Sequence, residues 1–388
     1  MNSVTIQPVS SRSGISRFLR FAETLYRDEP NWTPPTFVDD LRALSRKNPA
    51  CEFCDFQCYL ALRRHTVVGR VCAIVNHSAN AKWGVNVVRF GWLDFVEDAE
   101  VLDALLGAVE RFGRQYRCDT IKGPLGFTDM DKEGLLVEGF EHLSPFTCLY
   151  NFPYYGPMLN EAGFVKDVDW TQRVVSIGKE MPSMFQYADL VEQRFHVHVL
   201  KGVPRKRLIK QYGRKFFHTL NEAFLPLYQY SQLTDAQIDV YVKEYLSFLN
   251  LDFLSLVVNE NDDIVGFCTT CPSLSKALRK CRGRFFPFGW IHLLQALRHN
   301  DSLDALLIGV LPEYQGKGVT LLLFKHLHEA CIRYGIGQMI LNPQLEDNFQ
   351  VQSLFGEYET RPFARRRCYT KKIAPFDKRT TAPVALLN

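Results

Sequence analysis

The stretch DALLIGVLPEYQGKGVTLLLFKHLHEACIRYG, residues 304–335, joins an apolar run to an amphipathic run through a loop with two glycines and a lysine. The apolar run is typical of a buried strand, and the amphipathic run has the spacing of a helix. A helix start carries unpaired N–H groups and a partial positive charge, and glycines let the backbone approach a ligand closely. The loop therefore predicts a cradle for phosphate groups, to which Lys317 adds a positive charge.

Strand-like and helix-like segments follow a similar order in both halves of the 388-residue chain, which is long enough for two domains. In the second half, the last segment of this order is a helix-like run, NFQVQSLFGEY, at residues 348–358. The repeated order of strands and helices predicts two domains that each mix both kinds of element. We expect domains at residues 1–175 and 190–375 and a tail at 376–388.

The composition is that of a folded globular protein, with 46% hydrophobic and 13% aromatic residues. A net charge of +4 gives no sign of a nucleic-acid-binding protein. No apolar run approaches the roughly 20 residues that a membrane-spanning helix needs, and the first residues lack the apolar core of a signal peptide. The eleven cysteines lie mostly in apolar surroundings, so we expect reduced thiols in a cytoplasmic protein.

Two Cys-x-x-Cys pairs, Cys51 with Cys54 and Cys268 with Cys271, raise the possibility of a metal site. The second pair lies in a strand-like run, where residues three apart point to opposite faces of the sheet. The first pair has no second pair at zinc-ribbon spacing. We therefore expect no metal ion.

The glycine loop and its surroundings resemble the acyl-CoA-binding motif of the GNAT superfamily of N-acyltransferases. That motif is a strand, then V-x-P-x-x, then Q/R-x-x-G-x-G/A opening a helix. Val310, Pro312, Gln315 and Gly318 match four of the five defined positions, and Thr320 replaces the final small residue.

A second signature of the same family resembles the segment NPQLEDN, residues 342–348, ahead of the helix-like run. The resemblance covers residues 190–375 and implies a bound acetyl-CoA or another acyl-CoA. It also implies an α+β fold with α/β/α layers, in which each domain has a mixed, mostly antiparallel sheet with helices on both faces. Two parallel strands, DALLIGV and GQMILNP, would splay apart and receive the pantetheine arm between them, with the pyrophosphate over the helix start. The implied cofactor-binding residues are Ile308, Gly309, Val310, Gln315, Gly316, Lys317, Gly318, Val319, Thr320, Leu321 and Asn348.

The first half resembles a second domain of this kind that lacks the phosphate cradle. Its strand RFGWLDF, residues 89–95, runs into a segment with acids at the corresponding place: Asp94, Glu97, Asp98 and Glu100. These carboxylates would repel a pyrophosphate. We therefore expect one CoA site per chain, with the first half completing the substrate cleft or stabilising the second. Its segments at 123–140 and 151–164 resemble those of uncharacterised bacterial tandem GNAT proteins.

Acyl transfer from a thioester to an amine needs a base for the amine and a proton for the leaving thiolate. Asp304 and Glu313 flank the cofactor strand and are the base candidates. Many family members use as the acid a tyrosine that lies seven residues after the asparagine of the second signature. Here that asparagine is Asn348, and the tyrosine position is occupied by Phe355. Tyr358, nearly one helical turn later, and Tyr369 are the remaining acid candidates. For each of these residues a packing, capping or solvated role is the alternative interpretation.

The run around Asn261 has the pattern of a hairpin. An insertion, LSKALRKCRGRFFPFGWIHLLQALRHN at residues 274–300, separates this hairpin from the cofactor strand DALLIGV. Five basic residues lie between Lys276 and Arg284, and four aromatic residues follow by Trp290. The pattern predicts a basic surface beside a packed helix, or a docking surface for an acyl carrier protein, an acidic substrate or a membrane.

The sequence favours an acyltransferase that moves an acyl group, with acetyl expected, from acyl-CoA to the amine of a small molecule or peptide. Transfer of a long acyl chain from acyl carrier protein is an alternative that the insertion supports. A degenerate protein that binds CoA, or serves as a scaffold, is another, which Phe355 and Thr320 support. A peptidoglycan-type aminoacyl transferase is less consistent with the chain, because such enzymes lack an intact CoA loop.

Overall fold

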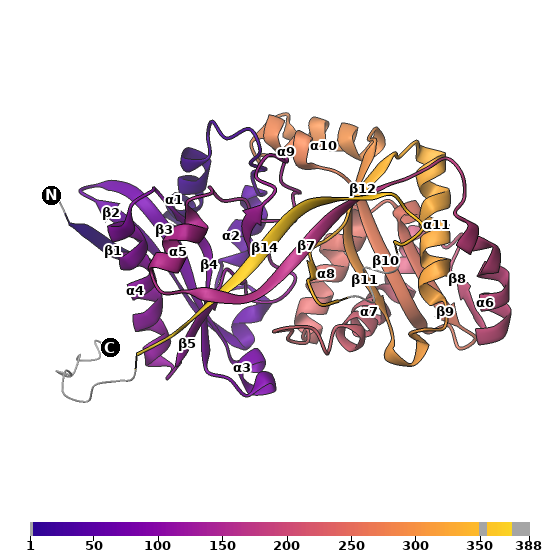
Figure 1. Cartoon of the computed structure of the whole chain (residues 1–388), viewed down its shortest axis with the longest axis horizontal. Helices are drawn as coiled ribbons and strands as arrows, with labels where there is room; N and C mark the ends of the chain where they lie inside the picture. Colours follow the sequence, from indigo (N-terminus) through magenta and orange to yellow (C-terminus); the bar gives the residue numbers. More distant parts are fainter. Residues whose placement is uncertain (1–2, 349–354, 375–388) are drawn as a thin grey trace.

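The computed structural model describes residues 3–348 and 355–374. The tail expected at 376–388 and most of the helix expected at 348–358 lie outside the described residues. The described elements form two lobes, which are crossed by two long strands (Figure 1).

The first lobe contains most of the elements that precede residue 177. Their bounds are β1 (Val4–Val9), α1 (Arg12–Leu25), α2 (Phe37–Ala43), η1 (Pro49–Glu52), β2 (Cys54–Arg63), β3 (Thr66–Asn76), α3 (His77–Trp83), β4 (Val87–Phe95), α4 (Ala99–Gln115), β5 (Thr120–Gly123), β6 (Leu135–Glu138), α5 (Tyr155–Glu161) and β7 (Val165–Ser176).

The second lobe contains most of the elements that follow. Their bounds are η2 (Ser183–Tyr187), α6 (Ala188–Phe195), β8 (Val197–Val199), α7 (Arg205–Ala223), α8 (Asp235–Phe248), η3 (Leu251–Phe253), β9 (Leu254–Asn259), β10 (Ile264–Pro272), α9 (Ser275–Cys281), α10 (Gly289–Arg298), β11 (Ser302–Val310), η4 (Pro312–Tyr314), α11 (Val319–Tyr334), β12 (Gln338–Ile340), β13 (Gln344–Leu345) and β14 (Thr360–Lys372).

One continuous sheet runs through both lobes in the order β1-β2-β3-β4-β5-β14-β7-β12-β11-β10-β9-β8, with β6 beside β14 and β13 beside β7. Only the pairs β4–β5 and β11–β12 are parallel within the described residues. Each lobe therefore has the mixed, mostly antiparallel sheet that the sequence predicts.

Helices cover both faces of each half of the sheet, which confirms the predicted layers. On β3, Val71 and Ala73 pack in the same core as α4, whereas Cys72 and Ile74 pack in the same core as α1. On β11, Leu303 packs with α11 on one face and Leu306 packs with α7 and α8 on the other. Successive side chains of a strand point to opposite faces, so these apolar strands serve two cores each.

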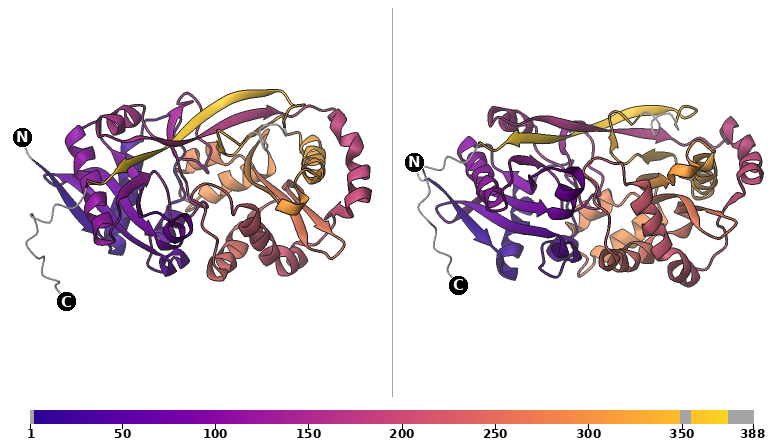
Figure 2. Two further views of the ribbon diagram at one scale, coloured as in Figure 1. Left: turned by 60° about the horizontal axis from the view of Figure 1, so that its bottom comes forward. Right: turned by 90° about the horizontal axis from the view of Figure 1, so that it is seen from below.

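The strands β7 and β14 join the two sheets that the sequence led us to expect as separate units. They run antiparallel side by side across both lobes (Figure 2). The edge of β14 away from β7 pairs with β5 in the first lobe, and the edge of β7 away from β14 pairs with β12 in the second. The last described strand, β14, therefore completes the sheet of the first lobe.

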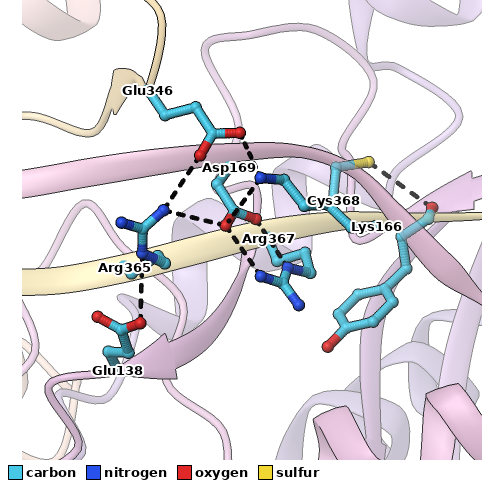
Figure 3. Close-up of polar contacts among 8 residues, drawn as sticks. Glu138, Lys166, Asp169, Glu346, Arg365, Arg367 and Cys368 are labelled. Carbon is cyan, nitrogen blue, oxygen red and sulfur yellow. Dashed lines mark hydrogen bonds and ion pairs between the residues drawn. The ribbon is translucent and has the colours of Figure 1, made fainter.

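A buried carboxylate, Asp169 on β7, ties these two strands together (Figure 3). It accepts hydrogen bonds from Nε and Nη2 of Arg367 at 2.7 and 2.9 Å and from Nη1 of Arg365 at 3.1 Å. Burial by itself would raise the pKa of Asp169, but the arginines outweigh burial and lower this pKa below its usual value. Lys166 and Glu346 extend the network to the turn after β13.

Candidate active site

The two parallel strands of the second lobe, β11 and β12, separate part-way along their length. They pair from Ser302 with Gln338 to Asp304 with Ile340, and β11 then continues to Val310 without a strand on that edge among the described residues. The Nδ2 atom of Asn342, just after β12, donates a hydrogen bond to the Leu306 carbonyl at 2.9 Å across the opening. The predicted splay is confirmed, and it leaves part of the β11 edge open to a ligand.

The loop after β11 folds as the glycine pattern predicts. Gly316 and Gly318 have φ values of +71° and +78°, a left-handed conformation that glycine adopts without steric cost. The backbone N–H groups of Gly316, Gly318, Val319 and Thr320 donate no hydrogen bond to another described residue. These groups lie at the start of α11, where the helix dipole adds a partial positive charge. The loop can therefore bind an anion.

The surroundings of the two glycines differ. A Cβ atom built on Gly316 would have no atom within 4 Å, whereas one on Gly318 would lie 2.7 Å from Cγ2 of Val191 in α6. The Nζ atom of Lys317 lies over the Tyr314 ring, 5.2 Å from its centroid. The face at Gly316 is thus open, with a lysine charge beside it.

A cavity of about 120 Å³ lies where the two lobes meet. The second lobe contributes residues from α7, α8, β10, β11 and the segment after β12, among them Thr269, Leu306, Leu307, Asn342 and Pro343. The first lobe contributes the segment after β5, and the lining is completed by Thr147 and Cys148. Because Leu306 and Asn342 belong both to the strand opening and to the lining, the cavity adjoins the opening between β11 and β12.

Three carboxyl groups of the first lobe, Asp129, Asp131 and Glu133, line this cavity. Burial raises the pKa of Asp129 to about 7, against the attraction of Arg89 and Lys82. Burial also raises the pKa of Asp131 to about 6 and that of Glu133 well above its usual value. At neutral pH such groups can exchange protons with a bound amine, which an ordinary carboxyl group does poorly.

The two aspartates differ in how they are held. Oδ2 of Asp131 accepts hydrogen bonds from the N–H groups of Phe127 and Thr128 at 2.8 and 3.1 Å, so its carboxylate is fixed by the backbone. Oδ2 of Asp129 is buried and has no hydrogen-bond partner among the described residues. The Asp129 carboxylate is therefore the better placed of the two to accept a proton from a ligand.

No family model matches the chain. A solved structure, a tandem GNAT protein from the clavulanic acid biosynthesis pathway, superposes with a TM-score of 0.56 at 12% sequence identity, over 97% of this chain and 100% of that one. This chain has the fold of a tandem GNAT protein. Two curated relatives match along nearly their whole length. Protein YghO of Escherichia coli (strain K12) is 26% identical over 378 residues, 94% of each chain. A bacterial ceramide synthase of Caulobacter vibrioides (strain NA1000 / CB15N) is 24% identical over 389 residues, 95% of this chain and 98% of that one.

Within the tandem GNAT fold, the sequence-predicted cofactor residues form two groups. Ile308, Gly309 and Val310 lie on β11 beyond the strand separation, and Gln315 to Leu321 form the loop and the first turn of α11. The Nε2 atom of Gln315 donates to the Val310 carbonyl at 3.2 Å and links the two groups. Asn348 lies in the turn after β13, where its N–H donates to the Leu345 carbonyl at 3.0 Å.

The predicted catalytic residues are not brought together. Asp304 is buried on β11, and its carboxyl oxygens have no hydrogen-bond partner among the described residues. Burial raises the pKa of Asp304 to about 7, and the nearby Ser273 side chain partly opposes this rise. Glu313 is exposed in η4. The hydroxyl group of Tyr358 lies 3.3 Å from Nδ1 of His328, in the core beneath α11, and Phe355 packs in the same core. None of these four residues lines the cavity between the lobes.

Sequence reasoning missed the acids at 129–133. The signal was local: three carboxyl groups within five positions, in a segment already notable for its resemblance to tandem GNAT proteins. It also missed Asn342, the first residue of the second signature, whose side chain crosses the strand opening. The described residues contain no cluster of three or more His, Cys, Asp or Glu side chains suited to a metal ion. None of the described helices combines the length and apolarity needed to span a bilayer.

Proposed function

We propose that this protein is an N-acyltransferase that joins the acyl group of an acyl-CoA to an amine held in the cavity between the lobes. The observation that carries the proposal is the junction of the β11–β12 opening with a cavity lined by acids whose pKa values are raised. A thioester group lying in the opening would meet an amine in the cavity. The relative named as a ceramide synthase supports this reaction class, because a ceramide is a fatty amide of an amino alcohol.

The acyl-CoA fits the residues at the start of α11. The loop has an open face at Gly316, the charge of Lys317 and four backbone N–H groups that have no partner among the described residues, and these features suit a pyrophosphate. The exposed edge of β11 from Ile308 to Val310 suits the amide groups of a pantetheine arm, as added strands do at sheet edges. When bound, acyl-CoA supplies an activated thioester carbonyl. The role of Asn348 toward the pantetheine arm stays a prediction.

The acids at 129–133 would prepare the amine. A free amine is protonated at neutral pH and attacks a carbonyl only after it loses that proton. Asp129 has a pKa of about 7, and its Oδ2 accepts no hydrogen bond from the part of the chain that the structure describes, so it would accept the proton, while Asp131 is held by the backbone. Asp304, whose pKa is also about 7, and Glu313 are retained as alternatives, but neither lines the cavity.

We expect a single CoA site per chain, because the protein's own groups fill the corresponding positions of the first lobe. There β4 and β5 also separate, after Arg89 with Lys122. The edge of β4 that would bind a pantetheine arm is already in contact with a side chain of the protein, because the Phe95 N–H donates a hydrogen bond to the Tyr155 hydroxyl group at 3.1 Å. Oδ1 of Asp98 caps the start of α4 by accepting from the N–H groups of Glu100 and Val101. An anion at this helix start would compete with a carboxylate.

The proposal also concerns whether the transferred acyl group is long or short. The ceramide synthase relative and the apolar share of the cavity lining, including Phe216 and Phe217, favour a fatty acyl chain or a lipid amine. The acetyl group that the sequence analysis expected is the second candidate, and an acyl carrier protein as donor stays a prediction.

Calorimetric titration with CoA, acetyl-CoA and palmitoyl-CoA tests the donor site. We expect one molecule bound per chain, and a stoichiometry near two would contradict the asymmetry of the lobes. Incubation of the bound protein with a panel of amines, including long-chain amino alcohols, followed by mass spectrometry of amide products, tests the reaction. Binding of CoA without any amide product would favour the degenerate alternative, and absence of CoA binding would refute the proposal.

A further inference from the structure

Helices α9 and α10 lie at the upper edge of Figure 1 near the junction of the lobes, and α10 and the link between the two helices carry an unusual concentration of exposed apolar side chains. Five of the fifteen exposed large hydrophobic residues of the described chain fall within nine positions. They are Phe286, Phe288, Trp290, Ile291 and Leu294, which we call the apolar tip. Phe286 and Phe288 are 85% and 68% exposed, values unusual for phenylalanine in a water-facing surface.

The apolar tip is held in place by the local fold. The Nε1 atom of Trp290 donates to the Pro287 carbonyl at 3.1 Å, and the N–H of Ile291 donates to the Phe288 carbonyl at 3.1 Å. A side chain at Gly289 would collide with the Arg284 carbonyl at 1.8 Å, so only glycine allows this close return of the chain. Leu297, on the inner side of α10, packs against the core of α7 and α8. The outward face is therefore a fixed feature of the folded chain.

Exposed basic side chains stand next to the apolar tip. We call them the basic flank: Lys276, Arg279, Lys280, Arg282 and Arg298. No Asp or Glu occurs anywhere in residues 273–300. A further arginine, Arg284, pairs with Glu23 of α1 at 2.6 Å, whereas no residue of the basic flank has an ion pair among the described residues. The surface thus combines uncompensated positive charge with projecting aromatic side chains.

We propose that the apolar tip and the basic flank together bind the surface of a bilayer that contains anionic lipids. Phenylalanine and tryptophan side chains enter the boundary between headgroups and acyl chains, and lysine and arginine remain at the headgroups. Each basic residue near an anionic surface strengthens binding about fivefold. An acidic carrier protein would use the basic flank as well, but it gives no reason for phenylalanines exposed at a projecting turn. This inference goes beyond the proposed reaction and does not depend on it.

Flotation of the full chain with lipid vesicles tests the inference without any activity readout. We expect the chain to float with vesicles of phosphatidylcholine and phosphatidylglycerol at 3:1, and to float weakly with phosphatidylcholine alone. The triple change Phe286→Ser, Phe288→Ser and Trp290→Ser should lower partitioning about tenfold or more, because the apolar insertion is lost. Three side chains exposed elsewhere, changed as Val165→Ser, Tyr187→Ser and Leu225→Ser, form the matched control and should leave partitioning unchanged.

The basic flank has its own variant and control. Neutralising Arg279, Lys280 and Arg282 to Gln should weaken binding to the anionic vesicles about 100-fold at low salt, with little effect on neutral vesicles. Neutralising the exposed residues Arg111, Arg117 and Lys179, on other parts of the surface, should have little effect. Circular dichroism and thermal unfolding check that each variant is folded.

Three outcomes would overturn the inference. The first is a parent chain that floats with neither vesicle, and the second is a folded serine variant that floats like the parent. The third is tight binding of acyl carrier protein that the glutamine variant loses, with no binding to vesicles. The third result would assign the surface to an acidic protein instead.

Discussion

Replacing Gly316 by Asp or by Asn tests the phosphate cradle with a change of a single charge. Gly316 has a φ of +71°, and a Cβ atom there would have no neighbour within 4 Å. Asp and Asn are the side chains that best tolerate a left-handed backbone, so both variants should fold with a similar small cost. Gly318 is less suitable, because a side chain there would collide with Val191 and confuse lost folding with lost binding.

The expected difference follows from Coulomb's law. A carboxylate about 6 Å from a pyrophosphate, at the surface and in physiological salt, costs about 2 kcal/mol after screening. The free N–H groups of the loop remain in both variants, so this repulsion is the main difference between them. CoA should therefore bind the Asp variant about 30-fold more weakly than the Asn variant.

Isothermal titration calorimetry with CoA measures both Kd values, and thermal unfolding confirms that the two variants are equally folded. Raising the salt concentration should narrow the gap between the variants, because screening weakens the repulsion. Equal Kd values in two folded variants would refute the placement of the pyrophosphate at this loop, whatever the absolute affinity.

The remaining predictions concern the acids and one tyrosine. Asp129→Asn should lower kcat about 10²–10⁴-fold, and the parent's rise in rate as pH increases through about 7 should be lost; an unchanged pH profile would exclude Asp129 as base. The pKa of Asp304 is raised on folding to about 7, so its stabilising contribution is complete below the unfolded value and is lost as pH rises through 7. Thermal unfolding should show the parent's free energy of unfolding falling by about 4 kcal/mol from below about pH 4 to pH 8, relative to that of Asp304→Asn. Stability curves that stay parallel over this range would contradict the prediction. Asp169→Asn should cost about 3–5 kcal/mol at pH 7; because folding lowers the pKa of Asp169, denaturant titrations should show this gap beginning to close below about pH 4, where the unfolded chain binds the proton, and closing fully only once the folded carboxylate is protonated at lower pH. Tyr358→Phe should slow turnover less than about tenfold, since its hydroxyl group meets His328 in the core; a larger loss with unchanged CoA affinity would make it the acid.

Local sequence patterns determined the elements that build the cofactor side of the site. The apolar run, the two glycines and the amphipathic run at residues 304–335 predict β11, a left-handed loop and the start of α11, and each is present. These signals are reliable because strand periodicity, positive φ and helix starts depend on residues close together in the chain. The basic and aromatic composition of residues 274–300 was equally visible in the sequence, but exposure of the aromatic side chains was not.

The tertiary structure alone decided which parts of the chain meet. Strand β14 pairs with β5, although Tyr369 and Gly123 are far apart in sequence, and nothing in either strand specifies that partner. The same folding carries Asp129 of the first lobe to a cavity beside Leu306 of the second. The raised pKa of Asp129 exists only there, because it arises from burial and not from neighbours in the sequence. The sequence thus determined the local shape of the phosphate loop, whereas long-range strand pairing and burial decided where the candidate acids lie and how they titrate.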